Sequence, residues 1–126
     1  MMKRLSTIWL AGLVVLTLVA TMTLRAGLAK ADGVTFTCHP DLVVAANVRV
    51  VAHCAAGYAI SGGPTIFWFA YPTSDSANAS RMLSVFEVAN ATGATVTFYF
   101  DTNDLSGAAY GCLNADCRAI WAATTP

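Results

Sequence analysis

The stretch "SDSANASRMLSVFEVANATGATVTFYF" (residues 74–100) changes its hydrophobic period partway along. Its first part carries apolar residues at helical spacing, which form a single stripe: Ala79, Met82, Leu83, Phe86 and Ala89. Ser74 or Asp75 can cap the start of this helix, and Gly93 can end it in the left-handed conformation. The following segment, residues 94–101, has the period of a strand, with Val96, Phe98 and Phe100 opposite Thr97 and Tyr99. The stretch therefore predicts a helix followed directly by a strand.

Further strand patterns lie on both sides of this stretch. They are "VTFTC" (34–38), "NVRVVAHC" (47–54) and "TIFWFAY" (65–71) before it, and "CRAIWA" (117–122) after it. The second segment alternates, with Val48, Val50, Ala52 and Cys54 opposite Arg49, Val51 and His53. The third is apolar on both faces, with Phe67, Phe69 and Tyr71 expected opposite Trp68.

Three strands, one helix and two strands follow one another along the chain. This order, β-β-β-α-β-β, is that of the OB-fold, a five-stranded Greek-key barrel. The sequence therefore predicts a mostly β fold with one helix, arranged as an OB-like barrel. The main alternative is an open α+β sheet with the helix packed across one face.

The first residues of the chain have the pattern of an export signal. Lys3 and Arg4 precede an apolar run from Ile8 to Leu24, and Ala29-Lys30-Ala31 matches a signal-peptidase site. We therefore expect residues 1–31 to be a signal peptide and residues 32–126 to be one secreted or periplasmic domain. An uncleaved membrane anchor is the alternative, although the run is short for a bilayer span.

Removal of this leader would change the charge balance of the chain. Of the seven basic residues four lie in the leader, whereas all seven acidic residues follow it. The mature chain keeps Arg49, Arg81 and Arg118 against seven carboxylates, a net charge of 3 − 7 = −4 with histidine neutral. An acidic surface without lysine disfavours nucleic acid and anionic membranes as partners.

Four cysteines in an exported chain of this size predict two disulfides. Three pairings are open, and local closure favours Cys38–Cys54 and Cys112–Cys117. A zinc site built from Cys112, Cys117, His39 and His53 is the alternative, but the spacing lacks a second close pair. We expect no metal and no cofactor.

Motifs for catalysis are missing from the sequence. It has no G-x-S-x-G, no H-E-x-x-H and no glycine-rich phosphate loop. Asp101, Asp104 and Asp116 flank one loop but match no calcium-binding pattern. We therefore expect a protein that is not an enzyme.

The aromatic residues are the better indication of function, because Trp and Tyr rings can stack on sugars. The candidate ligand-binding residues are Arg49, His53, Trp68 and Tyr99. Val85 and Val88 lie off the apolar stripe of the helix and are the candidate interface residues. The simpler reading of residues 65–71 is that both faces of the strand are buried in a small barrel.

The helix, the glycine and strand of residues 74–100, and "GAAYGCLNADC" (107–117) resemble the pentameric B subunits of AB-type toxins. The nearest are those of the subtilase-cytotoxin and typhoid-toxin type. The same stretches are similar to small secreted bacterial proteins of uncharacterised function. The resemblance implies an OB-fold homo-oligomer that binds a cell-surface glycan and carries an enzymatic A subunit. It implies no particular glycan-binding residue, because the N-terminal third matches only loosely.

Two functional classes follow. The first is a secreted non-enzymatic binding module, glycan-binding and oligomeric. The second is a structural or inhibitory envelope protein without a small ligand.

Overall fold

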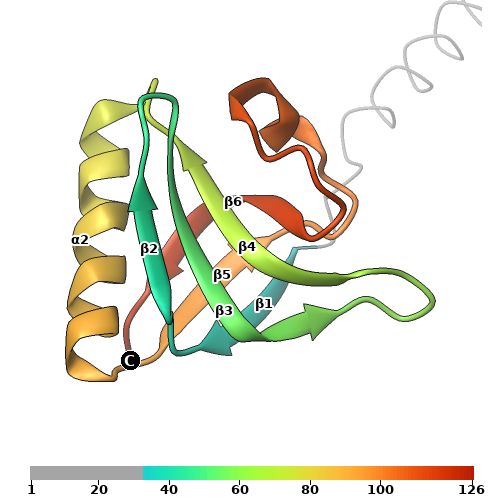
Figure 1. The fold of residues 1–126 in the computed structure, drawn as a ribbon, viewed down its shortest axis with the longest axis horizontal. Helices are drawn as coiled ribbons and strands as arrows, with labels where there is room; N and C mark the ends of the chain where they lie inside the picture. The colour runs from blue at the N-terminus through green and yellow to red at the C-terminus, as the bar shows by residue number, and fades with distance from the viewer. Residues whose placement is uncertain (1–32) are drawn as a thin grey trace, which may run out of the picture. The chain divides into compact units, whose positions relative to one another are not determined.

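The computed structural model describes residues 33–126, and the predicted leader lies outside these residues. Figure 1 shows a curled sheet with one long helix beside it. The elements in chain order are β1 (Val34–Cys38), β2 (Leu42–Ala45), β3 (Arg49–Ala59), β4 (Thr65–Pro72), α2 (Ser76–Thr92), β5 (Val96–Phe100), the 3₁₀ helix η1 (Ser106–Tyr110) and β6 (Cys117–Thr124). The prediction of a mostly β fold with one helix is confirmed.

The sheet has the topology of an OB-like barrel. Its six strands lie in the order β1-β5-β6-β4-β3-β2. All neighbours are antiparallel except β4 and β6, which pair in parallel. The strands at the two ends of this order, β1 and β2, are consecutive in the chain and are joined by residues 39–41. Together they take the place of the single first strand of an OB-fold.

The predicted number of five strands is therefore wrong by one. Residues 42–45 form a strand of their own, with the register Leu42↔His53 to Ala45↔Val50 on β3. Pro40 interrupts the ladder between the two pieces because it has no N–H to donate. Val48 lies in the hairpin that joins β2 to β3, and it is 54% exposed.

The helix begins and ends where local chemistry predicts. Asp75 is the N-cap, and its side chain accepts a hydrogen bond from the backbone N–H of Asn78. Hydrogen bonds from Asn78 and from the Tyr71 hydroxyl hold the pKa of Asp75 below its ordinary value. At the other end Gly93 has φ +74° and takes the left-handed C-cap position.

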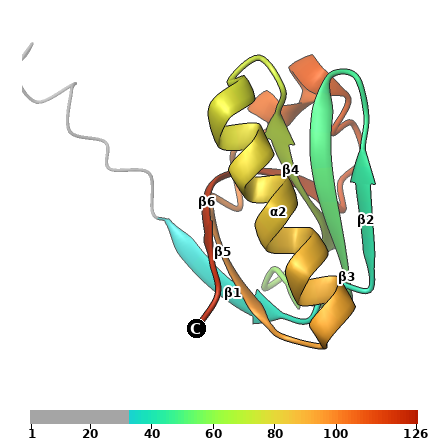
Figure 2. The same ribbon diagram turned by 90° about the vertical axis from the view of Figure 1, so that its left-hand side faces the viewer.

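One face of α2 fills the open side of the curled sheet (Figure 2). Ala79, Phe86 and Ala89 are buried, and Met82 and Leu83 pack against the same core, so the predicted stripe is confirmed. The ring of Phe86 lies 5.6 Å from that of Phe98, which lies 4.4 Å from that of Phe69. Val85 also packs partly against this core, whereas Val88 is 57% exposed.

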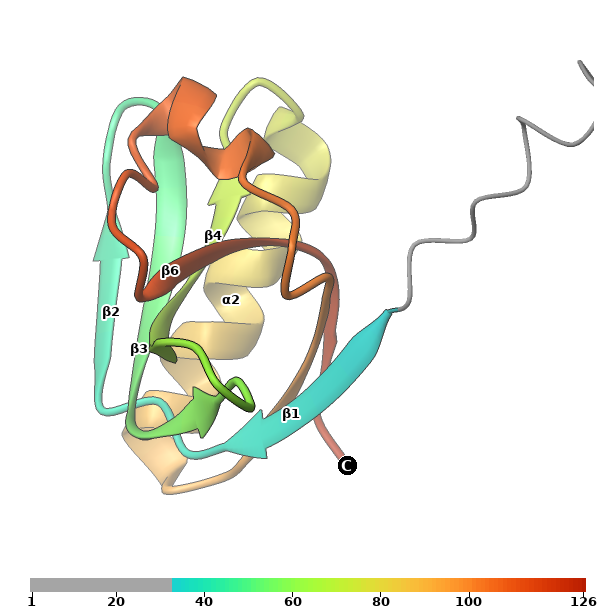
Figure 3. The same ribbon diagram turned by 90° about the vertical axis from the view of Figure 1, so that its right-hand side faces the viewer.

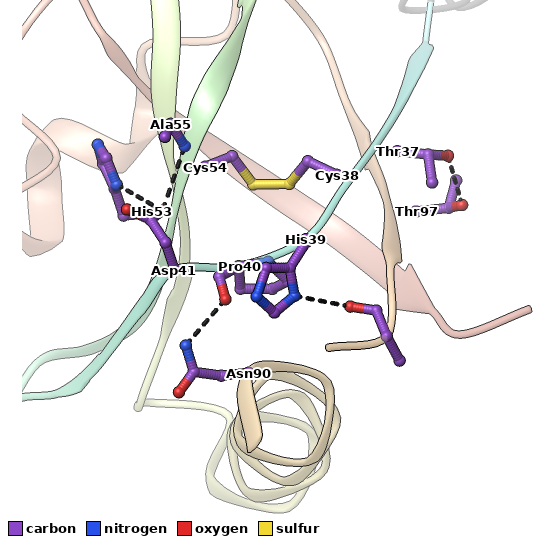
Figure 4. Close-up of a disulfide and its surroundings, with 11 residues drawn as sticks. Thr37, Cys38, His39, Pro40, Asp41, His53, Cys54, Ala55, Asn90 and Thr97 are labelled. Atoms are coloured by element: carbon purple, nitrogen blue, oxygen red, sulfur yellow. Dashed lines mark hydrogen bonds and ion pairs between the residues drawn. A yellow bond between two sulfur atoms is a disulfide. The ribbon is translucent and has the colours of Figure 1, made fainter. Parts of the chain in front are cut away.

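The corner between β1 and β2 is attached to three neighbouring elements (Figure 4). A disulfide joins Cys38, the last residue of β1, to Cys54 in β3. The ring of Pro40 is fully buried, and its carbonyl accepts a hydrogen bond of 2.8 Å from the Asn90 side chain of α2. His39 Nδ1 donates to the carbonyl of Ala94, just after the helix, at 3.0 Å. The favoured Cys38–Cys54 pairing is confirmed.

The second disulfide, Cys112–Cys117, closes a loop that covers the outer face of β3 and β4. Both cysteines are buried there with Val51 and Ala70. Trp68 and Tyr110 are partly buried against this second cluster. The outer face of the third predicted strand is therefore covered by the chain itself. Two formed disulfides are consistent with an oxidising compartment.

A bulge between β3 and β4 changes which face Phe67 occupies. The register shifts between His53 and Tyr58, and Gly57 in this segment has φ +62°. A Cβ at Gly57 would lie 2.6 Å from the Phe67 ring, so only glycine leaves room for it. Phe67 belongs to neither core cluster and stacks near His53, with 6.1 Å between ring centroids. The expectation that it shares the face of Phe69 is wrong.

Within residues 33–126, α2 falls short of the length and apolar content of a bilayer-crossing helix, and no other candidate is present.

Truncation of the buried Phe86 side chain tests how α2 packs on the sheet. Phe86 is 0% exposed, so Phe86→Ala should lower the free energy of unfolding by about 3–5 kcal/mol. Ser84→Ala, on the exposed side of the helix, should change it by less than about 0.5 kcal/mol. Chemical denaturation of both variants measures the difference, and similar losses in the two would contradict the assigned face.

Candidate functional site

A groove lies on the outer face of the barrel, between the β2–β3–β4 surface and the loop closed by Cys112–Cys117. Its volume is about 290 Å³. This is near the lower end of ordinary ligand pockets, which is about 300 Å³. The residues that line it come from three strands and the loop: Val44, Arg49, Val51, Trp68, Gly111, Leu113, Asn114, Asp116 and Cys117.

Trp68 forms the aromatic wall of this groove. It stands on β4 opposite His53 of β3, because the two residues are direct partners in the strand register. The ring centroids of Trp68 and His53 are 4.4 Å apart with an interplanar angle of 53°. The indole is therefore supported from behind by a second ring, which limits its freedom to rotate.

His53 is in turn oriented by Asp41. Its Nδ1 donates to Asp41 Oδ1 at 2.8 Å, and the backbone N–H of Ala55 donates to the same oxygen at 3.2 Å (Figure 4). Partial burial raises the pKa of Asp41, but these hydrogen bonds and the nearby imidazole outweigh it and leave the pKa below its ordinary value. A chain of contacts thus runs from the β1–β2 corner through His53 to Trp68.

Arg49 supplies the cationic group of the groove. Its Nη1 donates to the carbonyl of Tyr110 at 3.2 Å, which ties the start of β3 to the end of η1. Gly111 has φ +90°, and a Cβ at this position would collide with the Arg49 guanidinium. Glycine is therefore needed at position 111 both for the backbone turn and for room beside Arg49.

Asp116 contributes an acidic group to the lining of the groove. Its backbone carbonyl accepts hydrogen bonds from the N–H groups of Phe67 and Trp68, at 2.9 and 3.0 Å. Its side-chain Oδ1 is buried and has no hydrogen-bond partner among the described residues. A buried carboxylate oxygen without a partner is costly to the folded chain.

Arg118 holds the base of the loop from inside. It is 5% exposed, and its guanidinium donates to the carbonyls of Thr102, Ala115 and Cys117 at 2.7, 2.8 and 2.6 Å. Among residues 33–126 no carboxylate lies within 4.0 Å of this guanidinium. Its role in the described chain is to satisfy loop carbonyls, which keeps the loop over β3 and β4.

The predicted ligand-binding residues are only partly gathered by the fold. Arg49 and Trp68 both line the groove, and His53 lies behind Trp68. Tyr99 lies on β5, which is separated from β4 by β6, and does not line the groove. Val85 and Val88 are on α2, away from the groove lining.

Sequence reasoning missed the loop residues of the groove, Leu113, Asn114 and Asp116. The sequence around Asp116 indicates only an acidic loop, and Leu113, which is 75% exposed, carries no signal. The glycine before the first cysteine of the loop, Gly111, is the one local signal that this turn approaches another part of the chain closely. Its contact partner, Arg49, lies too far away in sequence to be paired with it by spacing.

The arrangement offers groups that can bind a ligand. His53 and Asp41 form a histidine–carboxylate pair, but within residues 33–126 no serine or cysteine is hydrogen-bonded to the ring, as a nucleophilic triad would need. In the same residues no cluster of three or more His, Cys, Asp or Glu side chains could hold a metal ion. What the groove presents is one aromatic wall, one guanidinium and one carboxylate.

Comparisons with protein-family models, with curated proteins and with solved structures return no match for this chain.

The Asp41–His53 pair predicts how the stability of the fold depends on pH. The pKa of Asp41 is lowered in the folded protein from 3.8, so its contribution to stability is present above that pH and is lost as the pH falls through the lower folded value. Asp41→Asn keeps an acceptor oxygen but removes the charge. The melting temperature of this variant should therefore lie below that of the wild type at neutral pH, and the gap should narrow in acid.

Thermal unfolding followed from about pH 7 down to about pH 2 measures this gap. Glu87→Gln, which removes an exposed carboxylate from α2, is the matched control and should track the wild type. A difference in melting temperature between Asp41→Asn and the wild type that stays constant over this pH range would contradict the stabilising role of the Asp41 charge.

Proposed function

We propose that this protein is a secreted, non-enzymatic binding module that takes a glycan in the groove beside Trp68. The observation that carries the proposal is the position of the indole. Trp68 is half-buried, braced from behind by His53 at 4.4 Å, and lines an open groove together with charged side chains. An aromatic ring that is held in place can receive the apolar face of a sugar ring at little entropic cost.

The polar groups around Trp68 support the same ligand class. Arg49 provides N–H donors, and Asp116, which also lines the groove, provides a carboxylate acceptor. Sugar hydroxyls can both donate and accept, so a pyranose can satisfy both side chains at once. The groove volume of about 290 Å³ suits one or two sugar rings better than a large cofactor.

Secretion, oligomerisation and a toxin-type A subunit as partner belong to this proposal as consequences of the sequence resemblance. Both formed disulfides support export. The groove lies across three strands and one loop of a single chain, so glycan binding does not depend on an A subunit.

A glycan array probed with the mature, oxidised protein tests the proposal. Any glycan that binds should bind Trp68→Ala and Arg49→Gln at least about tenfold more weakly, which corresponds to about 1.4 kcal/mol. Trp121→Ala is the control, because Trp121 is 49% exposed on β6 and does not line the groove. Circular dichroism of each variant checks that the fold is retained.

Failure of every glycan to bind would overturn the proposal and favour the alternative, a structural or inhibitory envelope protein. Binding that is lost in Trp121→Ala and kept in Trp68→Ala would place the site on the β6 side of the barrel instead.

A further inference from the structure

The strand β2 leaves one margin of the sheet open. It is the last strand in the sheet order, and within residues 33–126 its only strand partner is β3. Figures 2 and 3 show β2 at the margin of the described chain, with α2 against one of its faces. An open margin of this kind exposes a row of backbone donors and acceptors.

The hydrogen-bond pattern between β2 and β3 identifies which backbone groups of β2 have no partner on β3. Ala46 donates its N–H to the carbonyl of Arg49 at 2.8 Å, so this pair is hydrogen-bonded. In an antiparallel ladder hydrogen-bonded pairs alternate with pairs that are not. Val44 and Leu42 therefore direct their backbone groups to β3, and Val43 and Ala45, opposite Ala52 and Val50, direct theirs outward.

This margin lacks the features that usually protect an edge strand. Proteins block edges with charged side chains, proline or bulges. The run from residue 42 to residue 48, "LVVAANV", contains no charged residue and no proline. On its outer face Leu42 is 47% exposed and Val44 is 38% exposed. An unprotected apolar edge of this kind is suited to pairing with another strand.

We propose that the partner of this edge is β2 of a second copy of the chain, paired antiparallel about a two-fold axis at Val44. In that register Val43 faces Ala45 of the second copy and Ala45 faces its Val43. Each of these two symmetry-related pairs can exchange both of its N–H···O=C bonds. The side chains of Val44 from both copies meet at the axis, where the pair is not hydrogen-bonded and the strands approach most closely.

The charges at the ends of β2 favour this arrangement. Asp41 precedes the uncharged run and Arg49 follows it. Antiparallel pairing brings the Asp41 end of one copy toward the hairpin end of the other, which carries Arg49. It also holds the two Asp41 carboxylates at opposite ends of the contact, which reduces repulsion between two chains of net negative charge.

The contact is expected to be weak. β2 has only four residues, and their pairing lies at the small end of specific interfaces, below about 1,200 Å². We therefore expect a reversible dimer with a dissociation constant on the order of 10 μM to 1 mM. This dimer goes beyond the proposed glycan binding and does not depend on it, because its backbone pairs are made by Val43 and Ala45, which do not line the groove. The side chain of Val44, at the axis, lies at the rim of both surfaces, since it also lines the groove.

Sedimentation velocity over a concentration series, with both disulfides intact, tests the dimer. Ala45→Pro removes an outward N–H without touching the β3 ladder, and Ala45 does not line the groove, so this variant tests the dimer alone. Val44→Lys puts a charge at the axis and also alters the groove lining. Each should raise the dissociation constant at least about tenfold. Val88→Glu changes a valine on α2 that is 57% exposed, against 38% for Val44, and should leave dimerisation unchanged.

Hydrogen exchange by NMR gives a second readout. It is made on the wild-type protein, so it does not depend on whether a variant folds. In wild-type protein the amides of Val43 and Ala45 should become protected as the concentration rises, whereas those of Leu42 and Val44 should be protected throughout. A monomer at every concentration, or a dimer disrupted by Val88→Glu and not by the β2 variants, would overturn the proposal. Loss of glycan binding in protein that still dimerises would bear only on the groove.

Discussion

The barrel depends on how the chain turns the corner at residues 38–41. The first strand of the fold has to pair with β5 in its first part and with β3 in its second, so it must bend sharply between them. The Cys38–Cys54 disulfide holds the bend to β3, and the Asn90 side chain holds the Pro40 carbonyl to α2. A bend that is fixed in this way closes the sheet around the main core, and small domains gain most from such covalent restraint.

The groove depends on the same corner through His53. Asp41, the last residue of the corner, orients His53, and His53 supports the indole of Trp68. The opposite wall comes from the loop closed by Cys112–Cys117, which Arg118 holds from inside. Each wall of the groove is therefore fixed by one disulfide. This explains how a domain of this size can keep an aromatic side chain half-exposed in a defined position.

Local patterns are informative where the interactions they reflect are themselves local. The cap at Asp75, the stripe through Phe86 and the glycine at position 93 are all local, and each is found where the pattern places it. Residues 42–45 were not predicted as a strand because four apolar residues after a proline carry too little periodicity. The face predicted for Phe67 is wrong because a bulge near Gly57 breaks the strand alternation on which the prediction depends.

The helix, the five strand segments other than β2, the OB-like order and the favoured cysteine pairs can be predicted from the sequence alone. These follow from periodicity, capping and spacing, which act over short stretches of chain. Only the tertiary structure decided that Arg49 and Trp68 share a groove with Asp116, whereas Tyr99 lies elsewhere. The physical reason is that the groove is made by a loop laid across strands that are far from it in sequence. Its position depends on the buried Arg118 and the second core cluster, which no short-range pattern encodes.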